Sequence, residues 1–214
     1  MSLRICEIFT SIQGESSFSG LPCLFVRLSG CNLKCVWCDT RYASESDYIL
    51  HHPEELAGLI NSSEINLVEF TGGEPLLQKT ELLKTLALIK KDKTILIETN
   101  GSVSLEGLSV DIIKIVDLKL PGSGEYGSFL FNNLSLMSKN DEIKFVVSDI
   151  TDYETMKMLI KQYGLGKKHK VLVSRTSCAS ITDREIAAMI INDKLNLRYQ
   201  IQLHKYIWKD ERGT

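Results

Sequence analysis

The sequence contains no long apolar run, no excess of charge and no low-complexity segment. No stretch approaches the roughly 20 apolar residues that span a bilayer, and residues 1–10, MSLRICEIFT, carry charges where a signal peptide is apolar. We therefore expect a cytoplasmic protein without a membrane partner. Lys and Arg total 25 against 27 Asp and Glu, a net charge of −2, so no direct nucleic-acid partner is expected.

The sequence does contain enough apolar residues for one core. Its 214 residues are 43% hydrophobic and 24% charged, which is typical of globular proteins. A chain of this length buries about 70% of its unfolded surface on folding. Because the sequence has neither a flexible linker nor an internal repeat, we expect residues 1–214 to form a single domain.

Short β-rich runs alternate with amphipathic stretches along the chain. Leu82, Leu86 and Ile89 share one helical face. Residues 151–154 and 182–185 match the capping box, in which a Thr and a Glu satisfy first-turn amides. A second helical face is formed by Met156, Leu159, Ile160 and Tyr163. The predicted strands are residues 23–29, 66–70, 94–98, 112–118, 143–147 and 170–174.

This alternation predicts an α/β fold of parallel strands with right-handed helical crossovers. A complete eight-unit barrel takes about 250 residues. We therefore expect an incomplete TIM-like barrel of about six parallel βα units, or a curled open sheet. Ligands bind such folds at the carboxyl ends of the strands, and the polar motifs described below follow those ends.

Three of the six cysteines are clustered with the spacing C-x3-C-x2-C, at Cys31, Cys35 and Cys38. A structural zinc site requires four N or S ligands, and His51 and His52 are expected to lead into a helix, so a zinc-stabilised binding module is the less favoured alternative. Three thiolates also suit an iron–sulfur cluster, on which one iron would stay open to another ligand. The isolated cysteines, expected to be small core residues, are Cys6, Cys23 and Cys178.

With Trp37 directly before the last cysteine, this motif resembles the signature of the radical S-adenosylmethionine (SAM) superfamily. The resemblance implies that Cys31, Cys35 and Cys38 hold a [4Fe–4S] cluster whose open iron is chelated by SAM. One electron from the cluster would cleave SAM to methionine and a 5′-deoxyadenosyl radical. An electron donor such as flavodoxin or ferredoxin is implied as a partner.

Other predicted strands also end in small or polar residues. Residues 71–75, TGGEP, place paired glycines where a backbone can approach a small ligand. The next predicted strand ends in residues 98–101, and the one after it leads into residues 117–124; each of these segments alone could be an ordinary turn. Downstream of the cysteine motif, the resemblance implies that SAM is bound by Trp37, Cys38, Asp39, Gly72, Gly73, Glu74, Thr99, Asp117, Leu118 and Lys119.

Both ends of the chain carry polar clusters. Residues 9–15, FTSIQGE, place an amide and a carboxylate around a glycine, which suits the donor and acceptor edge of a pterin or guanine-like ring. Arg27 could pair with a substrate carboxylate or form a surface ion pair. His204, within residues 202–206, could be structural or contact a ligand.

Together with Cys-Asp-Thr at 38–40, these motifs resemble the 7-carboxy-7-deazaguanine synthase family almost from end to end. The resemblance implies a Mg²⁺-dependent homodimer that converts 6-carboxy-5,6,7,8-tetrahydropterin to 7-carboxy-7-deazaguanine, a precursor of queuosine. Hydrogen abstraction at pterin C6, ring contraction and loss of ammonia are the implied steps. Thr40 is implied to bind Mg²⁺. The implied substrate-binding residues are Ile12, Gln13, Gly14, Glu15, Arg27, Thr71 and His204.

Two segments depart from the family pattern. Family members often end soon after the His-Lys-Tyr motif, so that their terminal carboxylate can approach the site, whereas residues 207–214 continue this chain. Residues 174–178 lack the proline expected in that loop. The alternative radical SAM function, a glycyl-radical activase, would require an open docking face for a partner protein instead of a small-ligand pocket.

Overall fold

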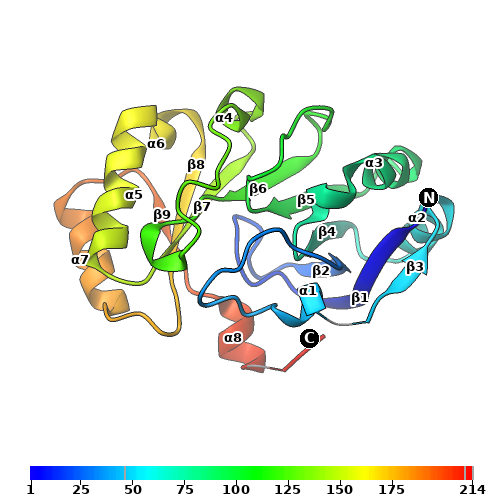
Figure 1. The fold of residues 1–214 in the computed structure, drawn as a ribbon, viewed down its shortest axis with the longest axis horizontal. Coiled ribbons are helices and arrows are strands. Elements are labelled where there is room, and N and C mark those ends of the chain that lie inside the picture. Colours follow the sequence, from blue (N-terminus) through cyan, green and yellow to red (C-terminus); the bar gives the residue numbers. More distant parts are fainter. Residues whose placement is uncertain (46, 210, 214) are drawn as a thin grey trace.

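The computed structural model describes residues 1–45, 47–209 and 211–213, which form a mixed α/β fold around one nine-stranded sheet (Figure 1). The strands are β1 (Leu3–Ile12), β2 (Pro22–Leu28), β3 (Ile49–His51), β4 (Leu67–Gly72), β5 (Thr94–Thr99), β6 (Ile113–Asp117), β7 (Glu142–Val147), β8 (Lys170–Arg175) and β9 (Arg198–Tyr199). Their order is β3-β1-β2-β4-β5-β6-β7-β8-β9. From β2 to β9 the neighbours are parallel, and β1 is antiparallel to β2 and β3.

The parallel part of the sheet confirms the strands predicted from apolar runs. β2, β4, β5, β6, β7 and β8 each agree with a predicted strand to within two residues at either end. β1, β3 and β9 were not predicted, because β1 mixes polar and apolar residues and the other two are too short for a periodic signal. β3 and β9 are the edges of the sheet, which is therefore open in the described residues.

Helices follow most of the strands, and the longer ones cover the sheet. They are α1 (Tyr42–Glu45), α2 (Pro53–Ser62), α3 (Lys79–Leu88), α4 (Asn133–Leu136), α5 (Ile150–Tyr163), α6 (Leu165–Lys168), α7 (Asp183–Asn192) and α8 (Leu203–Trp208), with 3-10 helices η1 (Pro75–Gln78) and η2 (Pro121–Ser123). α2 and α3 pack together on one flank, and α5 to α7 lie on the other (Figure 1). Among the described residues, no helix has both the length and the apolar character needed to cross a bilayer.

The predicted apolar helix faces point into the core. Leu82 is fully buried, and Met156 and Leu159 are buried on α5. The capping box at Thr182 is confirmed, with Glu185 as its partner. The capping box predicted at Thr151 is wrong. α5 begins at Ile150, and the Asp149 carboxylate accepts from Asp152 N at 2.9 Å, because aspartate caps a helix at least as well as threonine does.

Two features of this fold position the site. β4, β5 and β6 are parallel neighbours, so their carboxyl ends, at Gly72, Thr99 and Asp117, lie along the same edge of the sheet. α8 lies apart from the helices that cover the sheet and packs on the loop after β1, where Leu203 N donates to Gly14 O at 2.9 Å (Figure 1). The last helix therefore faces the carboxyl ends of the strands across one cavity.

Candidate active site

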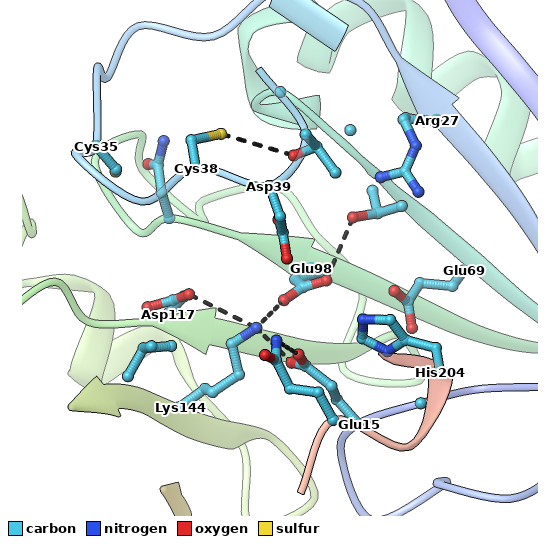
Figure 2. Close-up of a pocket in the computed structure, with 18 of the residues that line it drawn as sticks. Glu15, Arg27, Cys35, Cys38, Asp39, Glu69, Glu98, Asp117, Lys144 and His204 are labelled. Atoms are coloured by element: carbon cyan, nitrogen blue, oxygen red, sulfur yellow. Dashed lines mark hydrogen bonds and ion pairs between the residues drawn. The ribbon is translucent and has the colours of Figure 1, made fainter. Parts of the chain in front are cut away.

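One cavity brings together almost all of the site residues that the sequence suggested (Figure 2). From the cysteine motif and its neighbours, it is lined by Cys31, Cys35, Trp37, Cys38, Asp39 and Thr40. From the strand ends, it is lined by Thr71, Gly72, Gly73, Thr99, Asp117 and Lys119. From the chain ends and β2, it is lined by Ile12, Gln13, Gly14, Glu15, Arg27 and His204.

Glu74 and Leu118 do not line this cavity. Glu74 is fully buried behind it, where its carboxylate accepts from Leu76 N at 2.9 Å, Thr99 Oγ1 at 2.8 Å and Asn100 N at 2.7 Å. Burial raises the pKa of the Glu74 carboxyl. Leu118 is a core residue, 2% exposed. Both residues therefore support the cavity wall from behind, and Glu74 does so by joining the loops after β4 and β5.

The cysteine loop, between β2 and α1, is held by the loop after β4. Glu74 N donates to Gly30 O at 2.8 Å, and a Cβ at Gly73 would lie 2.1 Å from that same oxygen. Only glycine allows this approach of two backbones. Burial raises the pKa of the Cys31 and Cys35 thiols, and neither thiol is in a disulfide.

The chemistry of the cysteine loop fits an iron–sulfur cluster. Cys31, Cys35 and Cys38 are three free thiols on one cavity wall, which is the donor set of a cluster with one open iron. In the described part of the chain, no three His, Cys, Asp or Glu side chains already converge on a metal position. Of the isolated cysteines, Cys23 is buried as expected, but the core position predicted for Cys178 is wrong, because it lies exposed in the loop after β8.

A buried lysine occupies the centre of the cavity floor. Lys144 Nζ lies 2.6 Å from Glu15 Oε2 and 3.6 Å from Asp117 Oδ2, and it also donates to Glu98 (Figure 2). Burial alone would lower the pKa of Lys144, but the three carboxylates raise it well above its usual range. Burial likewise opposes ionisation of Glu15, but Lys144 lowers the pKa of that carboxyl to about 2. Lys144 and Glu15 are therefore both charged at neutral pH.

Glu69 differs from the other carboxyls of the cavity. The Glu69 carboxyl accepts a hydrogen bond from Gln13 Nε2, and Glu69 is only 2% exposed. Burial and the neighbouring Glu98 raise the pKa of Glu69 well above its usual range. Glu98 instead contacts Lys144 Nζ, and it also accepts from Thr71 Oγ1 at 3.3 Å. Glu69 therefore holds its proton more strongly than an ordinary glutamate does, while Glu98 beside it is paired with a lysine.

Arg27 lines the cavity and forms an ion pair at the same time. Its Nε donates to Glu7 Oε1 at 2.7 Å, and its guanidinium lies 5.5 Å from the Phe9 ring centroid. The terminal amino groups of this guanidinium have no hydrogen-bond partner in the part of the chain that the structure describes. Arg27 can therefore bind a carboxylate from the cavity side in bidentate fashion.

His204 and its neighbours on α8 close the cavity. A Cβ at Gly14 would lie 2.0 Å from His204 Nδ1, so the imidazole packs directly on that backbone. Burial lowers the pKa of His204, which keeps the ring neutral at pH 7. Next to it, Lys205 Nζ lies 2.7 Å from Asp39 Oδ2. This ion pair links α8 to the cysteine loop.

Sequence reasoning missed several residues of the cavity. The most central are Glu69 and Lys144, and each is a buried charged residue within a parallel strand. Such a residue is costly to bury without partners, so its position within the strand was an available signal. Glu98, Asn100, Gln202 and Lys205 lie in polar segments that the sequence indicated, but no site role was predicted for them. Only the packing of α8 and the strand ends places them on the cavity wall.

Comparison with known proteins agrees with this site. Residues 25–115 match the Radical SAM superfamily. The 7-carboxy-7-deazaguanine synthase of Koribacter versatilis is 40% identical over 98% of this chain and 98% of that protein. The one of Thermoplasma acidophilum is 37% identical over 99% of this chain and 100% of that protein. The crystal structure of QueE from Escherichia coli matches with a TM-score of 0.76 at 26% identity, over 94% of each chain. The chain therefore belongs to the 7-carboxy-7-deazaguanine synthases, a family of lyases in the radical SAM superfamily.

Proposed function

We propose that this enzyme converts 6-carboxy-5,6,7,8-tetrahydropterin to 7-carboxy-7-deazaguanine with loss of ammonia. The names of its relatives support this reaction. The observation that carries the proposal is that a single cavity is lined by the three clustered cysteines and by Arg27. A radical source and a binding group for a carboxylate would thus face the same small molecule.

Membership in the radical SAM superfamily implies a [4Fe–4S] cluster and SAM. When bound, they supply the 5′-deoxyadenosyl radical that starts the reaction. In our proposal Cys31, Cys35 and Cys38 hold the cluster, while Glu74 and Leu118 support the wall. The residues proposed to contact SAM directly are Trp37, Cys38, Asp39, Gly72, Gly73, Thr99, Asp117 and Lys119.

The substrate would lie between Arg27 and the loop after β1. Arg27 would bind its carboxylate, while Gln13 and Glu15 would bind the polar edge of the pterin ring together with Glu69. The neutral imidazole of His204 would close the pocket against solvent, which strengthens these polar contacts. Ile12, Gly14 and Thr71 would complete the wall around the ring.

Mg²⁺ would bind at the Thr40 hydroxyl and the substrate carboxylate. Mg²⁺ prefers oxygen ligands and is often held by few protein groups together with the substrate. Thr40 lines the cavity, and Asp39 next to it is already paired with Lys205. There the cation would hold and polarise the carboxylate during rearrangement.

Further expectations accompany this proposal. We propose that residues 1–214 form a single radical SAM domain whose sheet curls as a partial barrel of about six βα units. The enzyme would act as a homodimer and receive electrons from a flavodoxin or ferredoxin.

Anaerobic incubation with SAM, a reductant, Mg²⁺ and carboxytetrahydropterin tests the reaction, with mass spectrometry as the readout. We expect a deazaguanine product and release of ammonia. SAM cleavage without any deazaguanine product in the wild-type enzyme would refute the proposed reaction.

A variant tests the proposed role of Arg27. Arg27→Ala should weaken carboxypterin binding without abolishing reductive cleavage of SAM. Arg184→Ala, whose side chain is exposed on α7, is the matched control.

A further inference from the structure

Beside the proposed substrate arginine lies a charged group that the proposed function does not use. Glu7 accepts from Arg27 Nε at 2.7 Å and from the Tyr42 hydroxyl at 2.8 Å through one carboxylate oxygen. Its other oxygen accepts from Arg212 Nε at 3.2 Å. A single carboxylate is thus held between two guanidinium groups.

The end of the chain brings Arg212 to this place. Lys209, the residue after α8, has a φ of 58°, and this left-handed conformation redirects the backbone. The Arg212 guanidinium lies 4.1 Å from the centroid of the Tyr42 ring, and its Nη2 donates to Cys6 Sγ at 3.5 Å. In Figure 1 the C-terminal end lies close to α1 and β1, the elements that carry Tyr42 and Glu7.

The charges of these side chains indicate what Arg212 does. Arg27 and Glu7 are 13% and 15% exposed, and together they form a neutral pair. Burial would raise the pKa of Glu7, but Arg27, Tyr42 and Arg212 lower it, so the carboxylate is ionised at neutral pH. A neutral pair attracts an anionic ligand less strongly than a free guanidinium does. With Arg212 included, the group carries one net positive charge.

We propose that Arg212 is a positioning residue for the substrate carboxylate, because it neutralises Glu7 and so leaves the charge of Arg27 available to the anion. This inference rests on the proposed function, in which Arg27 binds that carboxylate. It assigns residues beyond the His-Lys-Tyr motif to substrate recognition. A purely structural Arg212 would instead affect all pterins equally.

Equilibrium binding of 6-carboxypterin and of pterin, which lacks the carboxylate, distinguishes these roles. The protein is the anaerobic holoenzyme with SAM and without reductant. We expect Arg212→Gln to weaken 6-carboxypterin binding about three- to fivefold, as for a half-exposed ion pair, and to leave pterin binding unchanged. Arg212→Lys should restore most of the affinity, and Arg184→Gln, exposed on α7, should have no effect. The effect of Arg212→Gln should shrink at high salt, which screens half-exposed charges.

Two results would overturn the inference. If Arg212→Gln lowers the affinity for 6-carboxypterin and for pterin equally, Arg212 has a structural role. If the variant keeps the full preference of the wild type for 6-carboxypterin, Arg212 has no role in recognising the carboxylate. Circular dichroism and thermal unfolding of each variant establish that it is folded before binding is compared. If the wild-type enzyme itself binds 6-carboxypterin no better than pterin, the proposed carboxylate site at Arg27 fails as well.

Discussion

The imidazole of His204 lies so close to Gly14 that a Cβ at residue 14 would come within 2.0 Å of Nδ1. The adjacent residues reinforce this contact. Leu203 N donates to Gly14 O at 2.9 Å, and Gln202 Nε2 donates to Glu15 Oε1 at 2.5 Å. Residues near both ends of the chain therefore form one wall of the cavity, although they are far apart in the sequence.

Gly14→Ala tests the importance of this packing. The added methyl group must displace the His204 ring, which opens the pocket to solvent. We expect 6-carboxypterin affinity to fall about tenfold or more, equivalent to about 1.4 kcal/mol, while SAM cleavage without substrate persists. Gly58→Ala is the control, because its Cβ on α2 meets no atom within 4 Å. Unchanged affinity in Gly14→Ala would remove His204 from the substrate pocket.

Lys144→Met leaves Glu15, Glu98 and Asp117 without their shared cation. Because breaking a buried ion pair leaves an uncompensated charge, we expect the free energy of unfolding to fall by about 3–5 kcal/mol in urea denaturation. Lys84→Met, which removes a 56% exposed partner of Glu81, should change it by less than about 1 kcal/mol. Adding Glu15→Gln to Lys144→Met should recover part of the loss. The prediction is wrong if Lys144→Met is as stable as the wild type.

The same network predicts a dependence of stability on pH. The pKa of Glu15 is about 2 in the folded protein, compared with 4.5 for an unperturbed glutamate. A carboxyl with a lowered folded pKa stabilises the protein above the unfolded pKa, and this stabilisation is lost as the pH falls from 4.5 toward about 2. The unfolding free energy should fall more over this pH range in the wild type than in Glu15→Gln. The difference between the two declines should be at most about 3 kcal/mol. Parallel curves would contradict the assignment.

Gly73→Ala should disturb the cysteine loop without touching a cysteine. Its Cβ would lie 2.1 Å from Gly30 O and 2.9 Å from Cys31 N, and backbone atoms cannot move aside as a flexible side chain can. We expect iron content after anaerobic reconstitution to fall well below the roughly four irons per chain of one cluster. Gly58→Ala should reconstitute fully. Normal iron content in Gly73→Ala would show that the loop tolerates the shift.

The predictable part of the fold was the part with strong local signals. The apolar runs of β4 and β7 are buried on both faces of a parallel sheet, so their strands could be read without tertiary information. β9 has two residues and β3 has three, and such short edge strands form only because a neighbouring strand offers hydrogen bonds. The N-cap of α5 was predicted at the wrong residue because Asp149 and Thr151 are both chemically suitable caps, and local sequence does not choose between them.

In the candidate site too, some features follow from local sequence and others only from tertiary contacts. The spacing of Cys31, Cys35 and Cys38 is a local pattern, and it placed all three on one cavity wall. By contrast, the role of Glu74 depends on the Thr99 hydroxyl and the Asn100 amide that it binds behind that wall, and both of these come from the end of another strand. No sequence pattern encodes such a meeting.

The sequence by itself determined the six parallel strands β2 and β4 to β8, the cysteine motif and the family resemblance, because these depend on residue type and local spacing. The tertiary structure alone decided which charges meet. Lys144 gathers carboxylates from three separate segments, and Arg212 reaches Glu7 across 205 positions of the chain. Electrostatic interactions depend on distance in space and on burial, so the electrostatics of this cavity appear only once the chain has folded.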